Sequence, residues 1–419
     1  MENKKKKLSA YYKPYKGLFL ADMVFAMIGA AITLVIPLMV RYITGTVVLL
    51  PIEEASSTII RLGIFMVLLV IVEGYCNYFI GYYGHVMGAK IEHDMRNEIF
   101  GHYQKLSFAF FDNQKVGHLL SRITSDLFDI TELLHHGPED VVISTIKLVG
   151  AFIILLMINA KLALVAIGFV VIMLLYAVGM NNRMCGAFRE NRARIADINS
   201  QIEDSLSGIR VVKSFSNEET EMDKFEEGNS RFVASKKRTY RFMGSYNSGM
   251  GVFSTLITVG SLLMGAWLMM KGELSAADLV TFLLYINNFT EPVKKLVNFT
   301  EQFQNGYSGY ERFLEIMSIA PDIKDKEDAQ SLDRVKGEIQ FEDVSFHYSE
   351  NKENVLSHVN LDVKPGEYVA LVGSSGAGKT TLCSLIPRFY DVTGGAVLLD
   401  GIDIRDVKLK DLRRQIGIV

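Results

Sequence analysis

The sequence predicts an α-helical membrane domain of six transmembrane helices followed by a smaller α/β domain, and three observations predict it. The first 290 residues contain six apolar stretches. The breaks between them alternate between short ones with few cations and long ones rich in Lys and Arg. Beyond residue 337, helical spacing gives way to the alternation typical of strands, around a glycine-rich loop. The hydrophobic content of 49% is also high for a soluble protein of 419 residues.

The first apolar stretch, Met23 to Val40, has 18 residues without a charge, close to the minimum of about 17 to 20 that crosses a bilayer. A basic start such as "MENKKKKLSAYYKPYKG" also opens secretory signals, but no small-residue cleavage site follows. We therefore expect a transmembrane helix behind a cytoplasmic tail that contains the Lys4 to Lys7 cluster. The other stretches run from Leu62 to Ala89, Leu148 to Ala160, Leu162 to Asn182, Phe242 to Met270 and, more weakly, Leu279 to Thr290.

The charges of the breaks predict the orientation in the membrane. The breaks near Pro51, near Asn159 and from Lys271 to Ala277 are short, whereas those from Lys90 to Arg122 and from Arg183 to Arg241 are long and basic. Lys and Arg accumulate on the cytoplasmic side. We therefore expect a multi-pass protein of the cell membrane with both termini, and the α/β domain, in the cytoplasm.

The two long breaks have the composition of helices. "VMGAKIEHDMRNEIFGHYQKL" contains no Pro and repeats its apolar residues at helical intervals, and "NRARIADINSQIEDSLSGIRVV" is similar. The membrane helices thus extend into the cytoplasm as two long hairpins. Their turns are expected around "FFDNQKVGHLLSR" and "SFSNEETEMDKFEEGN".

Three ionisable residues, Glu73, Lys147 and Glu291, lie inside the predicted spans. A charge inside a membrane is costly and is therefore a candidate for a functional group. The alternative is that these helices line a water-filled cavity, where a charge stays hydrated without binding a ligand. The sequence leaves both interpretations open.

The remaining sequence predicts a linker and a partial α/β domain. We expect a tail at 1–17, the membrane domain at 18–320, the linker at 321–336 and the α/β part at 337–419. The last part is expected to begin with a strand in "GEIQFEDVSFHY", with a slip near Asp343, and to continue with two strands around Pro365-Gly366. The second of these, Val369 to Val372, is expected to be a buried parallel strand. A helix from Thr380 to Arg388, a hairpin around Asp400-Gly401 and a final strand in "DLRRQIGIV" should follow.

The loop "GSSGAGKTT" predicts phosphate binding. Gly373, Gly378, Lys379 and Thr380 satisfy G-x-x-x-x-G-K-[ST], and a buried-type strand precedes the loop and a helix follows it. The glycines let successive N–H groups point into one concavity. Lys379 is expected to reach the β- and γ-phosphates, and the Thr380 hydroxyl to bind magnesium. The nucleotide-binding candidates are Gly373, Ser374, Ser375, Gly376, Ala377, Gly378, Lys379, Thr380 and Thr381.

Tyr348 is a further candidate, because it ends the first strand of the soluble part and its ring could stack on adenine. A Tyr at a strand end is also commonly an ordinary packing residue. The three cysteines are far apart and suggest neither a disulfide framework nor a zinc site, and the charge distribution does not indicate nucleic-acid binding.

These motifs together resemble an ATP-binding cassette (ABC) exporter half-transporter of the bacterial multidrug and lipid type. The resemblance rests on "FFDNQKVGHLLSRITSD", "GIRVVKSFSNEETEMDKF", "GYERFLEI", "FEDVSFHY" and "GSSGAGKTT", and covers nearly the whole chain. It implies a six-helix membrane domain followed by the first part of an α/β P-loop nucleotide-binding domain. Tyr348 matches the adenine-stacking aromatic residue. Asn113 to His118 and Asn217 to Lys224 match the coupling helices, although Val116 stands where Thr is common.

The resemblance also implies cofactors, partners and an activity. The cofactors are ATP and magnesium, and the partners are a lipid bilayer, an amphipathic transported substrate and a second half-transporter, identical or different. The implied activity is ATP-driven export by a dimer. The sequence itself does not identify the substrate.

The resemblance stops within the nucleotide-binding domain. The 419 residues lack the glutamine loop, the L-S-G-G-Q type signature, the aspartate and catalytic glutamate after the hydrophobic strand, and the switch histidine. We therefore expect a truncated chain that is inactive alone, with a marginally folded soluble part and exposed strand edges. The alternatives are a catalytically inactive membrane fragment that binds ATP weakly or not at all, and an anchored nucleotide-binding protein that transports nothing.

Overall fold

The computed structural model describes residues 7–348 and 353–419. Residues 1–6, which include Lys4, Lys5 and Lys6 of the predicted tail, lie outside the described residues. The chain divides into two compact units. One unit contains residues 7–91 and 129–308, and the other contains 92–128 and 309–419. Each unit is described by itself below.

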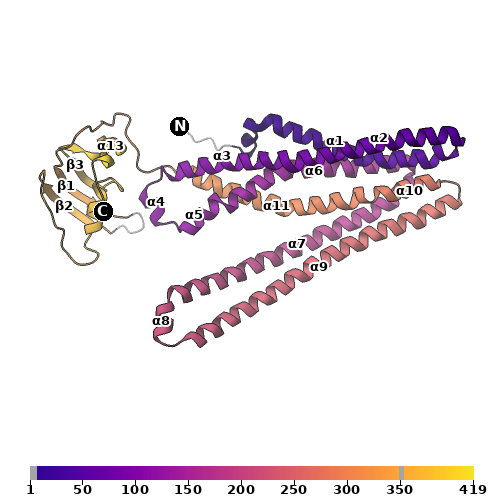
Figure 1. Ribbon diagram of the computed structural model, residues 1–419. Helices are drawn as coiled ribbons and strands as arrows, with labels where there is room; N and C mark the ends of the chain where they lie inside the picture. The colour runs from indigo at the N-terminus through magenta and orange to yellow at the C-terminus, as the bar shows by residue number, and fades with distance from the viewer. Residues whose placement is uncertain (1–6, 349–352) are drawn as a thin grey trace. The chain divides into compact units, whose positions relative to one another are not determined.

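The first unit is entirely helical, and its helices run along one long axis (Figure 1). Helices α3, α6 and α11 continue into the second unit. The elements are η1 (Leu8–Tyr15), α1 (Lys16–Gly45), η2 (Val47–Leu49), α2 (Ile52–Phe79), the π-helical turn η3 (Ile80–Gly84), α3 (His85–Tyr103), α6 (Ser125–Ile158), α7 (Ala160–Ser207), α8 (Ile209–Ser214), α9 (Glu218–Met270), α10 (Ala276–Tyr285) and α11 (Asn287–Ser318).

Polar side chains fix the short turns between the membrane helices. The Asn159 side chain accepts a hydrogen bond from the Leu162 N–H and so caps α7. Ser275 and Asp278 form a capping box at the start of α10. Arg41 of α1 also donates to Asp278, with 2.6 Å between Nε and Oδ1. The predicted short breaks near Asn159 and Lys271 are thus confirmed, because local side chains end and restart the helices there.

Five helical segments of the described chain are long and apolar enough to cross a membrane. They cover the first five predicted spans: Leu8–Leu49, Ile52–Tyr103, Val116–Ile158, Ala160–Ser207 and Glu218–Met270. The sixth predicted span, Leu279 to Thr290, is helical but is divided between α10 and α11 around Ile286. It does not meet the same criterion of length and composition. Its apolar residues pack among the other helices, so this segment does not need an apolar surface on every side.

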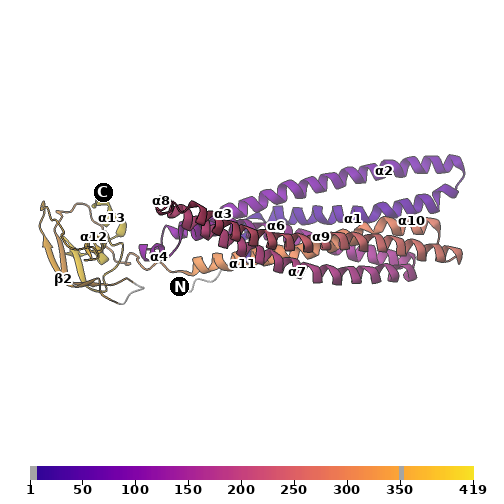
Figure 2. The same cartoon turned by 90° about the horizontal axis from the view of Figure 1, so that it is seen from below.

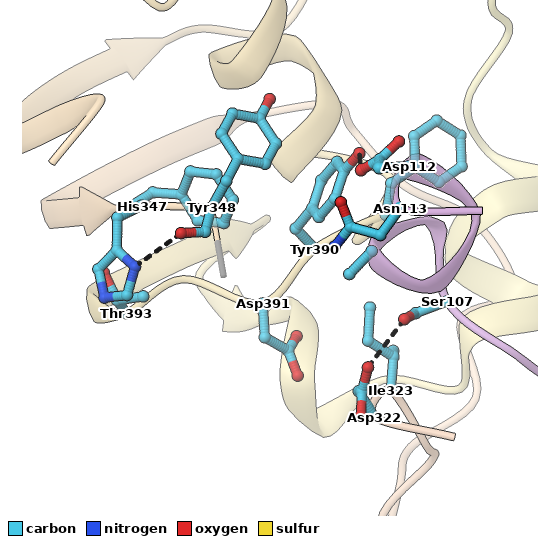
Figure 3. A pocket seen from close by; sticks show the side chains of 13 residues that line it. Ser107, Asp112, Asn113, Asp322, Ile323, His347, Tyr348, Tyr390, Asp391 and Thr393 are labelled. Atoms are coloured by element: carbon cyan, nitrogen blue, oxygen red, sulfur yellow. Dashed lines mark hydrogen bonds between the residues drawn. The ribbon is translucent and has the colours of Figure 1, made fainter. Parts of the chain in front are cut away.

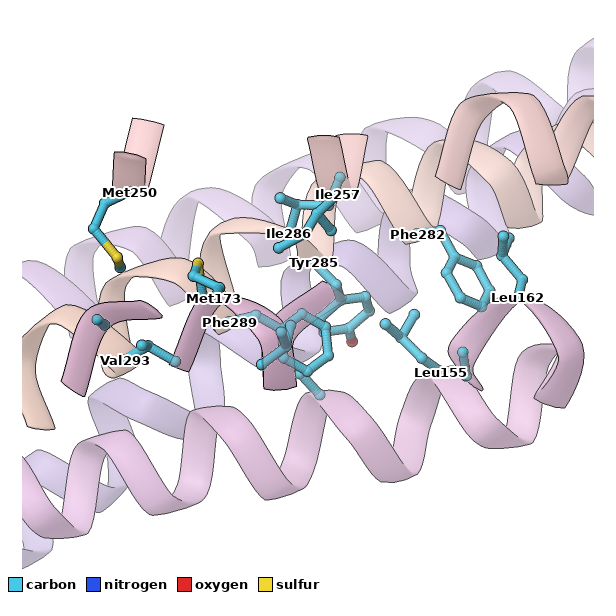
Figure 4. Packing of buried hydrophobic residues seen from close by; sticks show 14 of the residues in the cluster. Leu155, Leu162, Met173, Met250, Ile257, Phe282, Tyr285, Ile286, Phe289 and Val293 are labelled. Atoms are coloured by element: carbon cyan, nitrogen blue, oxygen red, sulfur yellow. The ribbon is translucent and has the colours of Figure 1, made fainter. Parts of the chain in front are cut away.

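The core of the first unit lies where α10 and α11 meet α6, α7 and α9 (Figure 4). Phe282, Tyr285 and Phe289 are almost completely buried there. The Tyr285 hydroxyl donates to the backbone carbonyl of Leu34 in α1, so its polar end is satisfied inside the apolar core. Around this core, α7 lies along α9 and α1 lies along both α2 and α10 (Figures 1 and 2).

The second unit combines the turn of the first hairpin with a small sheet. Its short helices are α4 (Phe108–Asp112) and α5 (Val116–Ile123). Arg312 of α11 holds the start of α6 through two hydrogen bonds to Asp126, of 2.7 and 2.6 Å. The sheet contains β1 (Ile339–Phe346), β2 (Leu356–Val363), β3 (Gly394–Leu399) and β4 (Ile402–Asp403), with α12 (Lys379–Leu385), η4 (Ile404–Asp406) and α13 (Leu409–Arg414) beside it.

The sheet has the order β2-β1-β3-β4, and every pair of neighbours is antiparallel. The predicted slip near Asp343 is confirmed. The register of β1 shifts against both β2 and β3 at this point, and Asp343 has a φ of 51°. The bulge lets Phe341, Val344 and Phe346 all reach the buried side. The predicted hairpin around Asp400-Gly401 joins β3 to β4.

Two predicted strands are wrong for this structure. Val369 to Val372 has no regular structure, and Val372 is 93% exposed. A strand needs hydrogen-bonded neighbours, and no described residue pairs with this segment. In the last segment, "DLRR" belongs to helix α13, and the residues after it form no strand among the described residues. Leu412, the apolar residue of that helix, is fully buried against the sheet core.

The two predicted coupling segments differ in form from simple helices. Asn113 to His118 spans the turn after α4 and the beginning of α5, and Asn217 to Lys224 forms the cap and first turns of α9. The short helix of the second turn is instead α8, just before it. The linker region, 321–336, is irregular. It nevertheless lies along the sheet, because Gln330 exchanges backbone hydrogen bonds of 2.8 and 2.9 Å with Asp406 and Lys408.

Candidate functional site

The glycine-rich loop curves around the ammonium group of its own lysine. Lys379 Nζ donates to the carbonyl oxygens of Gly373 and Ser374 at 2.9 and 2.7 Å. Gly376 and Gly378 have φ angles of 84° and 81°, in the left-handed region that glycine adopts at little cost. The loop therefore folds back on the positive charge of Lys379 through its carbonyl oxygens, whereas the predicted binding of phosphate by its N–H groups stays a prediction.

Gly378 is required for packing as well as for its backbone angle. A Cβ atom at this position would lie 2.8 Å from Leu356 Cδ2 and 3.2 Å from the carbonyl oxygen of Val355. The loop thus passes directly over the start of β2. This contact anchors the loop to the sheet, although the residues that precede it form no strand.

The two threonines after Lys379 have different surroundings. Thr380 is exposed, so its hydroxyl is open to solvent at the start of α12. Thr381 is buried, and its hydroxyl lies 3.0 Å from the Tyr348 hydroxyl. The structure therefore brings Tyr348 to the helix that follows the loop, 33 residues further along the chain.

The ring of Tyr348 is surrounded by two other aromatic rings. Its centroid lies 5.0 Å from that of Phe346 and 5.4 Å from that of Tyr390, and both pairs are edge-to-face. Tyr348 also lines a cavity of about 620 Å³ within the second unit (Figure 3). The cavity is also lined by Phe346 and His347 beside Tyr348, by residues in and around α4, by the linker and by the segment after α12. The aromatic residue thus lies in a hollow of a size that accepts a small molecule.

A contact between α4 and the segment after α12 was not predicted from the sequence. The ring centroids of Phe108 and Phe389 are 4.3 Å apart, and the Tyr390 hydroxyl donates to Asp112 Oδ2 at 2.7 Å. Figure 3 shows Tyr390 and Asp112 facing each other, with Asn113 next to them. Burial and the bond to Asp112 raise the pKa of Tyr390, so the hydroxyl remains a hydrogen-bond donor to Asp112 beyond the pH at which a free tyrosine ionises. The sequence could hardly predict this contact, because each of the residues that make it is a single aromatic or acidic residue outside any recognisable motif.

The structure also shows where the charged residues of the predicted spans lie. Glu73 and Lys147 line one cavity of about 310 Å³ in the first unit, whereas Glu291 is exposed on α11. The cavity further contains His136 and Glu139. With Lys295 of α11, charged side chains from three helices therefore line this cavity, and the structure leaves both interpretations of the charges in the spans open.

Comparison with known proteins adds the family. Residues 19–293 match the ABC transporter transmembrane region, and residues 356–419 match the ABC transporter family. The chain is 40% identical over 411 residues to the ABC transporter ATP-binding protein YwjA of Bacillus subtilis, covering 98% of this chain and 71% of that protein.

Two further relatives carry names that state a transported class. The ATP-dependent lipid A-core flippase of Syntrophus aciditrophicus is 30% identical over 415 residues, covering 99% of this chain and 68% of that protein. The putative multidrug export protein YgaD of Bacillus subtilis is 29% identical over 420 residues, covering 99% and 72%. The helical membrane unit, the glycine-rich loop and these matches agree. The chain belongs to the ABC transporters, as a multi-pass membrane protein that carries the transmembrane region and part of the ATP-binding domain.

Proposed function

We propose that this chain is a half-transporter that uses ATP to export an amphipathic small molecule or lipid across the cell membrane, acting as a dimer. Similarity to a named lipid flippase and to a named multidrug exporter supports the direction and the substrate class. The family supports the ATPase activity. The cavities in the described residues do not distinguish one amphipathic compound from another, so the proposal stays at the level of the class.

The proposed ATP site consists of Tyr348 and the loop from Gly373 to Thr381. The residues fit a magnesium-bound triphosphate. The loop curves around one ammonium charge, and the exposed Thr380 hydroxyl is the type of oxygen ligand that magnesium binds. Bound MgATP would supply binding energy and the γ-phosphate for hydrolysis. Lys379 would hold the phosphates, and Tyr348 would orient the adenine, while its hydroxyl stays on Thr381.

The observation that carries the transport proposal is the contact of α4 with Phe389 and Tyr390. These two residues follow α12 directly, and α12 begins at Lys379 of the loop. α4 lies in the turn of the first predicted cytoplasmic hairpin. The chain on either side of this turn continues into the membrane helices α3 and α6. A rearrangement at the loop on binding nucleotide can therefore act on the hairpin through Phe108 and Asp112. Such a contact is what converts binding energy into movement of helices.

Completion of the hydrolytic site requires groups beyond these residues. Phosphoryl transfer to water needs a positioned nucleophile in addition to the phosphate cradle. The signature, the catalytic glutamate and the switch histidine are not among the 419 residues. We therefore propose that the 419-residue chain alone binds nucleotide without turning it over. We also propose that export requires a second half-transporter and the complete set of motifs.

Nucleotide binding and transport should be tested separately. For binding, the chain purified in lipid nanodiscs is titrated with a fluorescent ATP analogue in the presence of magnesium. Lys379→Ala should weaken binding at least about tenfold, because the loop loses its charge for the phosphates. Lys364→Ala, which removes an exposed lysine from the turn before the loop, is the matched control and should bind as the native chain does.

For transport, inside-out vesicles are supplied with MgATP and an amphipathic fluorescent dye. They carry a version of the chain extended to the end of its reading frame. Uptake should depend on ATP and disappear in Lys379→Ala. Uptake that is unchanged in Lys379→Ala would refute the proposal, as would an extended chain that hydrolyses ATP but transports neither dye nor labelled lipid. Turnover by the 419-residue chain alone would show that the missing motifs are dispensable.

A further inference from the structure

A cluster of five ionisable side chains lies inside the first unit, which does not contain the glycine-rich loop. Asp22 comes from α1, His85 from the first turn of α3, and His135, His136 and Glu139 from α6. In two overlapping groups, one donor atom of each residue lies within 4.8 Å of those of the others: His85, His135 and His136, and Asp22, His135 and Glu139. His135 belongs to both groups. Nothing in the sequence motifs predicted this cluster, because its members are spread over 118 residues.

The backbone is shaped to accommodate the cluster. η3 (Ile80–Gly84), a π-helical turn between two α-helices, ends directly before His85. Single π-helical turns inside longer helices are rare and frequently occur at functional sites. Gly84 leaves the space that the side chains occupy. A Cβ there would lie 2.2 Å from His135 Cε1 and 3.1 Å from Asp22 Oδ1.

The buried members have unused bonding capacity. Asp22, His135 and Glu139 are 0%, 2% and 6% exposed. Within the described part of the chain, both carboxylate oxygens of Asp22, His135 Nδ1 and Glu139 Oε2 have no hydrogen-bond partner. A buried polar atom without a partner is costly, and a buried carboxylate is especially so. The nearby Lys295 does not relieve this cost, because it pairs with Asp140 at 2.8 Å.

The distances among the donors are compatible with one small cation. His135 Nε2 lies 3.1 Å from His85 Nδ1 and 3.9 Å from Glu139 Oε2, and His136 Nδ1 lies 3.7 Å from the same Glu139 oxygen. Ligands bound at about 2.0 to 2.2 Å from a shared metal are separated by about 3 to 4 Å. The separations among these nitrogen and oxygen atoms are therefore those of ligands that share one ion, with His135 binding through Nε2.

We propose that Asp22, His85, His135, His136 and Glu139 form a binding site for one divalent first-row transition-metal ion. Imidazole nitrogen combined with carboxylate oxygen is the ligand set that zinc, cobalt, nickel and iron accept. Magnesium and calcium prefer oxygen ligands alone. Asp22 and Glu139 are the central ligands, since their buried carboxylates have oxygens without a hydrogen-bond partner and each lies within reach of His135. The site connects α1, α3 and α6, so a bound ion would tie these three helices together.

The test uses cobalt as a visible probe of coordination. The 419-residue chain, purified in lipid nanodiscs without a polyhistidine tag, is titrated with Co²⁺ and its absorption spectrum is recorded. The native chain should bind one Co²⁺ with visible ligand-field bands, and equimolar Zn²⁺ should displace it. Asp22→Asn and His85→Gln should each weaken Co²⁺ binding at least about tenfold. His93→Gln, which changes an exposed histidine on α3 outside the cluster, is the matched control.

The choice of variants keeps the result interpretable. Asp22→Asn preserves the shape of a buried side chain, and His85 is exposed, so neither change removes core volume. Far-UV circular dichroism and elution volume check that each variant is folded. Equal Co²⁺ binding by the native chain, Asp22→Asn and His85→Gln would overturn the proposal. So would the absence of a Co²⁺ band in the native chain, or a loss in His93→Gln as large as in the cluster variants.

Discussion

The sheet and the segment that carries the glycine-rich loop belong to the same α/β part but differ sharply in order. In β1, Phe341 and Val344 are 3% and 0% exposed and pair with strands on both sides. In the segment from residue 364 to 378, Tyr368 and Val372 are 101% and 93% exposed, and no regular element forms. Both segments are apolar, so hydrophobicity alone does not decide which becomes a strand.

The difference shows what a strand requires in addition to apolar residues. β1 is an interior strand with hydrogen-bonded partners on each edge, and the buried face of the sheet covers its side chains. The segment at 364–378 has no strand partner among the described residues. Its hydrogen bonds are local instead, as between the Glu367 N–H and the Lys364 carbonyl, or run from the Lys379 side chain to the carbonyls of Gly373 and Ser374. The glycine-rich loop thus lies in an exposed segment without regular structure, the kind of segment in which ligand-binding loops are commonly found.

The largest expected effect is the difference in stability loss between a mutation in β1 and one in the segment at 364–378. Phe341→Ala should destabilise the sheet by about 3 to 5 kcal/mol, because it leaves a cavity in a closely packed core. Val372→Ala should change the stability by less than about 0.5 kcal/mol, since the side chain is already exposed. Hydrogen exchange followed by mass spectrometry, on peptides from β1, β2 and β3, measures both effects. If Val372→Ala accelerates exchange as much as Phe341→Ala does, the segment is packed in solution and the comparison fails.

A second, smaller effect concerns the ordering of the loop by its ligand. At a MgATP concentration of about 100 times Kd, binding stabilises the bound state by about 2.7 kcal/mol. Exchange in peptides covering Gly373 to Thr381 should therefore slow by up to about 100-fold, with little change in β1. The Lys379→Ala variant serves as the control and should show no slowing. Equal protection of β1 and the loop would indicate that nucleotide acts on the whole domain instead of the loop.

The sequence predicted the features that depend on neighbouring residues. The short break near Asn159, the slip near Asp343 and the hairpin around Asp400-Gly401 all arise from short stretches whose residue types restrict the backbone. The long membrane helices were predictable for the same reason, because their apolar composition extends over whole bilayer-spanning lengths. The sixth span was the weakest prediction, since its neighbours cover it and composition alone then says less.

The features that depend on distant residues were not predictable. The contact of Phe108 with Phe389 joins positions that are far apart in the sequence, and no motif identifies either ring. The cluster around His135 requires three helices and a π-helical turn to bring its members together. The misassigned strand at Val369 to Val372 has the same origin. A strand is defined by its partners, and the pattern within four residues contains no information about them.

The smallest expected effect tests the closed end of the sheet. Asp400 accepts hydrogen bonds from the N–H groups of Lys336, Gly337 and Glu338, at 2.6, 3.0 and 2.9 Å. Burial alone would raise the pKa of Asp400, but these three donors outweigh it and lower the pKa below its ordinary value of 3.8. The carboxylate therefore stabilises the fold fully above pH 3.8, and this contribution is lost as the pH falls through the lower folded-state pKa.

Asp400→Asn should accordingly cost less than about 1 kcal/mol at pH 7, because the site is only partly buried and solvent still screens its charge. The difference from the native chain should shrink below pH 3.8, where the native carboxylate also becomes neutral. Exchange rates of β3 and β4 peptides, compared between the two proteins at each pH, measure this difference. A difference that stays constant from pH 7 to pH 3 would mean that the lost hydrogen-bond geometry, and not the charge, accounts for the effect. In that case the closed end of the sheet would owe its order to shape alone, as the core around Phe341 does.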